Sequence, residues 1–206
     1  MDIWVGVSIL GGFFVLNYFF VGYLNRKNDR NIEDLAEEYD LEIQNLNPKG
    51  QVLHQKAVSR TMGIEIYNDH KGEDQISFVE LYWRCSNKDE LALSLYPEGY
   101  ISKLRKVFGM QDIIINKPLF DKRFIIKSNE PICTLELLDN AFCEQLLELD
   151  QTILCGRYEF RLAQGKLYYT EANTEFSSVD DYNRIIDLIE LGQHLAQNIS
   201  NYKLPG

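Results

Sequence analysis

Histidine and cysteine, the residues that most often carry chemistry, are few and scattered in this chain of 206 residues. The three histidines (His54, His70 and His194) have no companions at metal-ligand spacing, and no HExxH string is present. Strings typical of phosphate loops, dinucleotide-binding loops and serine hydrolases are also absent. The sequence therefore predicts no catalytic residue, no metal ligand and no cofactor. An enzyme whose site is assembled from dispersed residues, near His54, Asp112 or Asp121, stays an alternative.

The four cysteines do not indicate redox or metal chemistry. No two of them form a CxxC pair, although their number is even; they are Cys85, Cys133, Cys143 and Cys155. This pattern is typical of buried thiols in a reducing compartment and not of a disulfide framework. The paired carboxylates are interpreted structurally, Glu37-Glu38 as a solvated helix face and Asp180-Asp181 as a helix start.

Charge is distributed unevenly along the chain, whose formal net charge is -10. Residues 130–150 carry six acids and no base, whereas residues 99–127 hold seven bases and two acids. The acidic total argues against nucleic-acid binding, which needs a basic footprint. The bases either pair with acids across the folded domain, which we favour, or form a strip that faces anionic lipid or a partner. The strip consists of Lys103, Arg105, Lys106, Lys117, Lys122, Arg123 and Lys127.

Residues 3–24 contain no charge and no proline. As a helix they would extend about 33 Å, enough to cross a membrane whose hydrocarbon core is about 30 Å thick. Trp4 and Tyr23 stand near the two ends, where aromatic rings favour the membrane interface. A cleaved signal peptide is disfavoured, because no positive charge of a side chain precedes the segment. We therefore expect a single-pass membrane anchor.

The orientation of this anchor follows from the bases that flank it. Arg26, Lys27 and Arg30 come directly after the span, and no lysine or arginine precedes it. The positive-inside rule then places the N-terminus outside and the large domain in the cytoplasm. Ser8 and Gly12 form a small-xxx-small pair that permits close helix approach, which is common in such helices without self-association.

The remaining sequence predicts an α+β fold. The patterns indicate a juxtamembrane helix over 26–40, strands over 41–44 and within 51–97, a short helix over 100–108, and strands over 112–116 and 123–127. A helix over 131–149, a hairpin over 157–169 and a helix over 178–202 follow. We expect an antiparallel sheet of about six to eight strands packed with two or three helices. The expected division is an anchor (1–25), a juxtamembrane helix (26–40) and one domain (41–206).

Two strings carry a resemblance to a known family. They are Phe108-Gly109-Met110-Gln111-Asp112, which continues into the following strand, and Phe120-Asp121-Lys122-Arg123-Phe124. They resemble the FGxQDI…FDxxFxVxS pattern of an uncharacterised family of bacterial membrane-anchored proteins. The resemblance implies a helix, a β-hairpin and a closing helix after these strings, and it implies no activity. It also implies a bacterial origin, so that the expected anchor would lie in the inner membrane. From the residues themselves, Phe120 and Phe124 are expected in the core, and Asp121 is expected to cap a turn.

Three functions are compatible with these features. The first is an accessory or interaction domain at the membrane, which binds a protein partner there. The second is a sensor of anionic lipid or of a small ligand that uses the basic strip. The third is an enzyme without a recognisable motif. The absence of a catalytic constellation and the presence of the anchor favour the first.

Overall fold

The computed structural model describes residues 31–45, 54–71, 74–87, 90–99, 111–153, 157–172 and 178–202. The expected membrane segment (residues 3–24) and the expected helix over 100–108 lie outside these residues. Within the described ranges, no helix is both long and apolar enough to cross a membrane.

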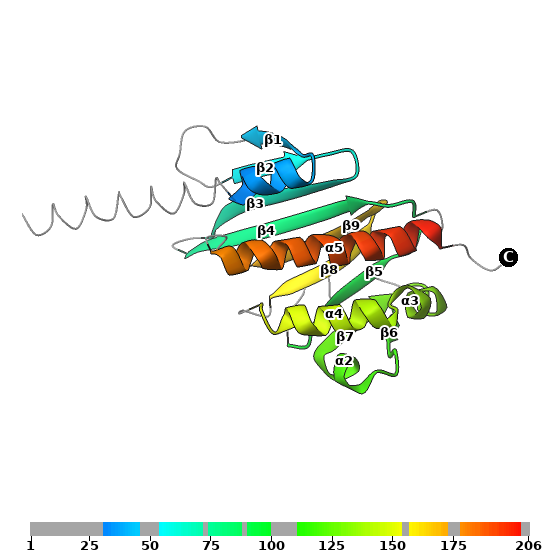
Figure 1. Cartoon of the computed structure of the whole chain (residues 1–206). Coiled ribbons are helices and arrows are strands. Elements are labelled where there is room, and N and C mark those ends of the chain that lie inside the picture. The colour runs from blue at the N-terminus through cyan, green and yellow to red at the C-terminus, as the bar shows by residue number, and fades with distance from the viewer. Residues whose placement is uncertain are drawn as a thin grey trace, which may run out of the picture.

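Nine antiparallel strands form one sheet, in the order β1-β2-β3-β4-β9-β8-β5-β7-β6 (Figure 1). The strands are β1 (Glu42–Asn45), β2 (His54–Val58), β3 (Met62–Lys71), β4 (Asp74–Arg84), β5 (Leu93–Pro97), β6 (Gln111–Ile113), β7 (Phe124–Ser128), β8 (Tyr158–Ala163) and β9 (Lys166–Ala172). The expected α+β class is confirmed, but the expected strand count of six to eight was too low. Strand β2 is hard to recognise because one of its two inward side chains is the polar Gln55.

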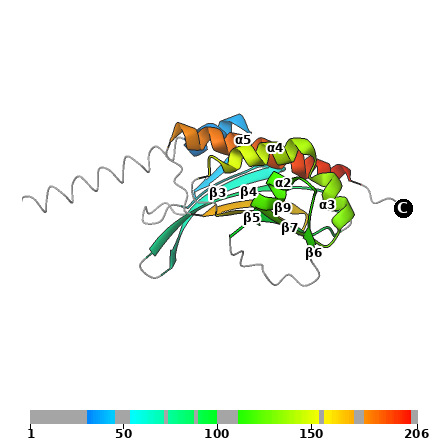
Figure 2. The same cartoon turned by 90° about the horizontal axis from the view of Figure 1, so that it is seen from below.

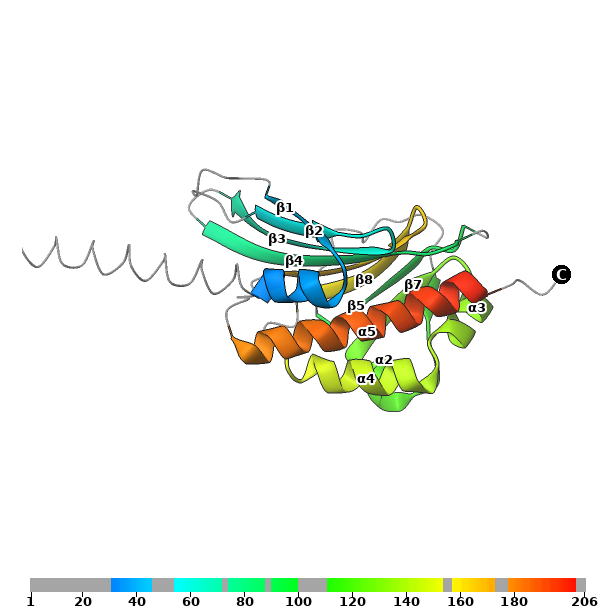
Figure 3. The same ribbon diagram turned by 45° about the horizontal axis from the view of Figure 1, so that its top comes forward.

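The helices lie together on one face of the sheet (Figure 2). A helix over residues 31–38 is followed by α2 (Pro118–Arg123), α3 (Pro131–Leu137), α4 (Asn140–Asp150) and α5 (Val179–Asn201). The longest of them, α5, packs on β4 and β9 and also contacts α4 (Figure 3). Its start is the expected capping box, because Ser178 and Asp181 each accept a hydrogen bond from the other's backbone N–H.

The sequence predicted one helix over 131–149, and this prediction was wrong. The last helical hydrogen bond of α3 runs from the Leu138 backbone N–H to the carbonyl oxygen of Thr134. Helix α4 begins after Asp139, whose carboxylate accepts a 2.8 Å hydrogen bond from Phe142 N–H. The apolar stripe continues across this break, so hydrophobic spacing alone does not reveal it. Asp139 was the available signal, since aspartate is a preferred N-cap residue.

The core lies between the sheet and these helices. One cross-strand row shows it, in which every side chain is buried: Ala57, Ile64, Leu81, Tyr169, Phe160, Leu95 and Ile126. Leu35 from the helix over 31–38 and Leu188 from α5 belong to the same cluster. The folded unit therefore includes the helix that precedes β1.

Candidate functional site

The sheet face opposite the helices is the part of the described structure with the most organised polar and aromatic side chains. In Figure 2 the strands arch beneath the helices, and this open face lies on the inner side of the arch. Because side chains alternate along a strand, every second residue of the central strands points to it. Among the described residues, no helix covers this face.

A charged cluster occupies one row of the open face. Lys56, Glu65, Glu80 and Thr170 follow one another across β2, β3, β4 and β9. Glu65 accepts a 2.7 Å hydrogen bond from Lys56 Nζ through one carboxylate oxygen, and its other oxygen lies 2.6 Å from His54 Nε2. Burial alone would raise the pKa of Glu65, but the bonds to Lys56 and His54 outweigh burial and hold that pKa below its ordinary value.

Glu80 lies directly opposite Glu65 and has a different environment. Burial raises its pKa, and the nearby negative charge of Glu65 adds to this effect. Arg161 and a 3.5 Å hydrogen bond from Thr170 Oγ1 act in the opposite direction without cancelling it. The pKa values of these two facing carboxylates therefore shift in opposite directions. The shift favours the charged form of Glu65 and the neutral form of Glu80.

Aromatic side chains form a second row beside this cluster. The rings of Tyr67 and Phe78 are stacked with centroids 5.1 Å apart, and the His54 ring lies 5.9 Å from Tyr67. Both Tyr67 and Phe78 are half-buried. Aromatic rings on an accessible face are typical of protein contact surfaces, which are enriched in tyrosine and phenylalanine.

A third group combines cations with tyrosines, and we call it the cation–tyrosine patch: Tyr82, Arg84, Arg161, Lys166 and Tyr168. Tyr82 and Tyr168 are cross-strand neighbours whose ring centroids lie 6.4 Å apart. Lys166 Nζ lies 4.8 Å from the centroid of the Tyr82 ring, and the Arg161 guanidinium carbon lies 5.2 Å from that of Tyr168. These are cation–π distances.

Gly63 allows the Tyr82 ring to lie flat on the sheet. A Cβ atom at position 63 would stand 2.5 Å from the ring, closer than two carbon atoms can approach. The glycine therefore leaves room for the ring that supports Lys166.

On the helix side of the sheet, polar groups are paired in ways that serve stability. Glu171 and Arg184 form a buried ion pair, and the Tyr169 hydroxyl donates a 2.7 Å hydrogen bond to Glu171. Burial, followed by the charge of Glu171, raises the pKa of Tyr169 well above its ordinary value. These contacts bind the sheet to α5, and no side chain of this group reaches the open face.

Of the seven bases in the expected strip, Lys103, Arg105 and Lys106 lie outside the described residues. Three others form hydrogen bonds within the domain. Lys117 Nζ donates to the carbonyl oxygen of Asp139 at 3.0 Å, and Lys127 Nζ donates to Asp112 at 2.6 Å. Arg123 forms a bidentate pair with Asp150. Lys122 is exposed on α2. The structure brings Lys117, Lys122 and Arg123 to α2 and its N-cap, whereas Lys127 lies on the open face of β7.

The other residues singled out from sequence have structural partners. Asp121 accepts hydrogen bonds from the backbone N–H groups of Ile115 and Lys117, as expected for a cap. Phe120 and Phe124 are buried, as expected. His194 Nε2 lies 3.2 Å from Asp139, which caps α4.

The described cysteines Cys85, Cys133 and Cys143 are free thiols. Burial raises the pKa of Cys85 to about 11, so its thiolate is disfavoured at neutral pH. The side chain of His70 and residue Cys155 are not described. In the described ranges, no three His, Cys, Asp or Glu residues are placed to hold a metal ion.

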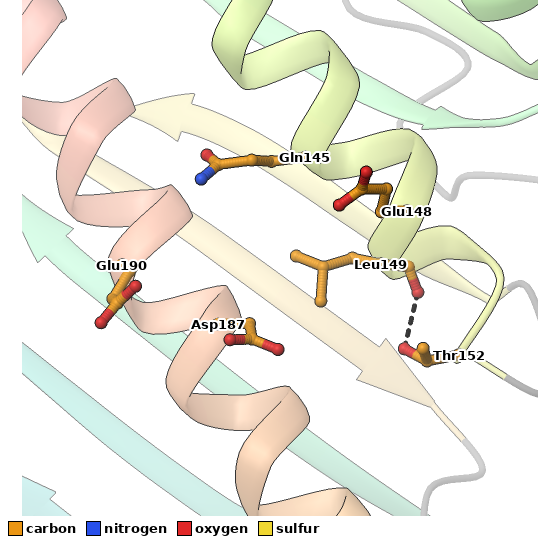
Figure 4. A pocket seen from close by; sticks show the side chains of 6 residues that line it. All are labelled: Gln145, Glu148, Leu149, Thr152, Asp187 and Glu190. Atoms are coloured by element: carbon orange, nitrogen blue, oxygen red, sulfur yellow. Dashed lines mark hydrogen bonds between the residues drawn. The ribbon is translucent and has the colours of Figure 1, made fainter.

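On the helix side, the described residues line grooves, of which two bear on function. One, of about 230 Å³, lies between α4 and α5 and is lined by Gln145, Glu148, Leu149, Thr152, Asp187 and Glu190 (Figure 4). Its three carboxylates come from two helices, and no basic residue lines it. The other lies beside Trp83, whose indole N–H has no hydrogen-bond acceptor among the described residues.

Most open-face residues were missed in the sequence; the exceptions are His54 and Lys127. Their strands were recognised in part, but the pairing of β4 with β9, which brings Tyr82 beside Tyr168, joins positions far apart in the chain. The available signal was alternation within β8 and β9, where Arg161, Lys166 and Tyr168 share the face opposite Phe160 and Leu167.

No protein-family model and no curated protein matches the chain. Among solved structures, the chain is similar to the mycobacterial trehalose monomycolate transport factor A, TtfA. The TM-score is 0.52 at 9% sequence identity, and the match covers 89% of this chain and 98% of that chain. At this identity the similarity concerns the fold alone.

Proposed function

We propose that this chain is an accessory domain, tethered by residues 3–24 to the inner membrane and facing the cytoplasm, which binds a protein partner through the open face of its sheet. The observation that carries the proposal is the open face itself. Its charged cluster, stacked rings and cation–tyrosine patch are ordered side chains that no described helix covers. Ordered aromatic and charged side chains on an accessible face suit recognition of another protein.

Two further observations support this proposal. The described part of the chain contains no metal-ligand cluster, and the two groups with the largest pKa shifts, Tyr158 and Tyr169, are buried in the core. The domain also has the fold of a protein whose description is a transport factor, a name that suits an auxiliary role. The lipid-sensing alternative is less well supported, because Lys117, Arg123 and Lys127 are engaged within the domain.

The test is recovery of the partner from membranes. The full chain, carrying an affinity tag, is expressed in a bacterium and purified in mild detergent after brief cross-linking. We expect a reproducible protein to copurify with the native chain and to be depleted when Tyr67 and Phe78 are both changed to alanine. The matched control is Leu119→Ala with Ile132→Ala, which removes exposed apolar side chains from α2 and α3 instead.

Two results would oppose the proposal. One is a chain that purifies without any reproducible companion. The other is a companion whose recovery is the same in the Tyr67/Phe78 variant and in the Leu119/Ile132 control.

The orientation is checked separately with a C-terminal tag, which protease should digest in inside-out vesicles and not in intact spheroplasts.

A further inference from the structure

Arg84 and Lys166 stand directly opposite each other on β4 and β9. Like charges at such a position repel each other and destabilise a sheet. Arg161 lies on the next strand, β8, beside Tyr168. None of these three cations has a carboxylate within ion-pair distance among the described residues. Acids are plentiful in a chain with a net charge of -10. Glu80 lies close enough to Arg161 for the two charges to interact, but no described acid forms an ion pair with Arg84 or Lys166.

Tyrosine rings support two of these cations, Lys166 and Arg161, without using their hydrogen-bond donors. A ring face attracts a positive charge but does not replace a strong oxygen acceptor. Lys166 above Tyr82 and Arg161 above Tyr168 therefore keep N–H donors for a ligand, with an ammonium supplying three and a guanidinium five. Tyr82 is only 9% exposed, so its ring is a fixed support. This arrangement is complementary to oxygen anions.

We propose that the cation–tyrosine patch binds an acidic, extended segment of the partner protein, an inference that rests on the proposed function and names the partner's chemistry. The three cations lie on three neighbouring strands, β4, β9 and β8, which are spaced about 4.8 Å apart. An extended chain presents alternate side chains on one side about 6.8 Å apart. The long, flexible side chains of lysine and arginine can absorb the difference between these spacings. A segment with Asp or Glu at alternate positions can therefore pair with these cations while its backbone crosses the strands.

The shape of the sheet favours a peptide over a lipid surface. Figure 2 shows that the sheet curves, and strand alternation puts the patch on the concave face. A flat bilayer cannot contact the whole of a concave sheet face, whereas an extended peptide can follow its curvature. A second copy of this chain, docked through the acidic groove between α4 and α5, is a different occupant and an outcome of the test.

The experiment measures binding of a labelled peptide of alternating Glu and Ser to the full chain in mild detergent, with a Gln-Ser peptide as the uncharged counterpart. The variants are Arg84→Gln and Lys166→Gln, and Lys122→Gln on α2 is the matched control. We expect binding of the acidic peptide alone, weakened by salt. Each patch variant should lower the affinity by about twofold to fivefold, the range for one exposed ion pair, and Lys122→Gln should leave it unchanged.

A loss of peptide affinity in Arg84→Gln cannot be attributed to unfolding. Arg84 is exposed and has no side-chain partner among the described residues, so Arg84→Gln removes only repulsion from Lys166. Its melting temperature should be unchanged or higher while peptide affinity falls. Equal peptide affinity in Arg84→Gln, Lys166→Gln and the native chain would overturn the inference, as would equal binding of the Gln-Ser peptide.

Other occupants give distinct results. Short-chain phosphatidylglycerol that binds in an Arg84-dependent way, while the acidic peptide does not bind, would assign the patch to lipid and overturn the inference. Concentration-dependent self-association that Arg84→Gln abolishes, again without peptide binding, would assign it to a second copy. A membrane partner whose recovery is unaffected by Arg84→Gln would contradict the inference and leave the proposed function standing. Peptide binding without any recovered partner would support the inference and oppose the proposed function.

Discussion

Glu80 makes the stability of the domain depend on pH. Its pKa is raised in the folded protein, so the folded state binds a proton more tightly than the unfolded chain does. Stability contributed by this group is therefore present at low pH and is lost as pH rises through the raised pKa. We expect Glu80→Gln to raise the melting temperature at pH 7, by up to about 4 °C for a chain of this size, and to have little effect at pH 4.

Glu65→Gln is the matched variant and should behave in the opposite way. The pKa of Glu65 is lowered in the folded protein, so its stabilisation is present above its ordinary pKa and lost as pH falls through the lowered pKa. Thermal unfolding at pH 7 should show a lower melting temperature for Glu65→Gln, and the difference should close on acidification. If both glutamines shift the melting temperature in the same direction at pH 7, the two carboxylates do not have the environments described.

The ion pair between Glu171 and Arg184 is buried, so each partner depends on the other. Removing one charge leaves the second uncompensated in the core, which costs about 3–5 kcal/mol. We expect Arg184→Met to lower the free energy of unfolding by this amount in urea titrations. The double variant Glu171→Leu/Arg184→Met should be more stable than Arg184→Met alone, because no buried charge remains. A double variant less stable than the single one would contradict this explanation.

At the scale of elements, α5 is held on the sheet by an interlock between Gly192 and Trp83. A Cβ atom at position 192 would stand 2.2 Å from the indole ring. Glycine within a helix normally costs about 1 kcal/mol relative to alanine, so Gly192→Ala would ordinarily stabilise α5. Here overpacking should prevail and lower the free energy of unfolding by about 1–3 kcal/mol. Adding Trp83→Leu should recover part of the loss in denaturant titrations, and a stabilised Gly192→Ala would contradict the interlock.

The elements differ in how far the sequence alone predicts them. The α5 helix could be predicted because its capping box and its apolar spacing agree over the whole segment. The break between α3 and α4 could not be predicted from periodicity, because Leu138 keeps the apolar stripe continuous while Asp139 starts a new helix. Helix α2 was missed because its six residues are too few for a periodic pattern.

At the scale of the molecule, the helix over residues 31–38 belongs to the core and not to a linker. Ile32 is 1% exposed and Leu35 is completely buried. We therefore expect a chain that begins at Asn31 to unfold cooperatively, and one that begins at Leu41 to be less stable by several kcal/mol, since each buried aliphatic side chain contributes about 2–5 kcal/mol. Circular dichroism during heating distinguishes the two. Glu37→Ala, an exposed change on the same helix, should have little effect and serves as the control.

The candidate site could not be predicted because its residues come together only through the order of the strands in the sheet. Alternation places Tyr82, Arg84 and Lys166 on faces of their own strands, but only the pairing of β4 with β9 places them on one surface. That pairing joins positions more than 80 residues apart in the chain, and α5 packs against both strands. Sequence reasoning consequently identified His54, which lies within the charged cluster, without its partner Glu65.

The same pairing has a consequence for biosynthesis. Strands β1 to β4 are neighbours in sequence and can associate as soon as they emerge from the ribosome, but β4 then exposes its free edge until β9, residues 166–172, has been translated. Such an edge is a template for pairing with other chains. Long-range β pairing is also slow to form. The nascent chain thus passes through an aggregation-prone stage that lasts from residue 84 until residue 166 has been translated, and a holding chaperone bound to the β4 edge would protect it there.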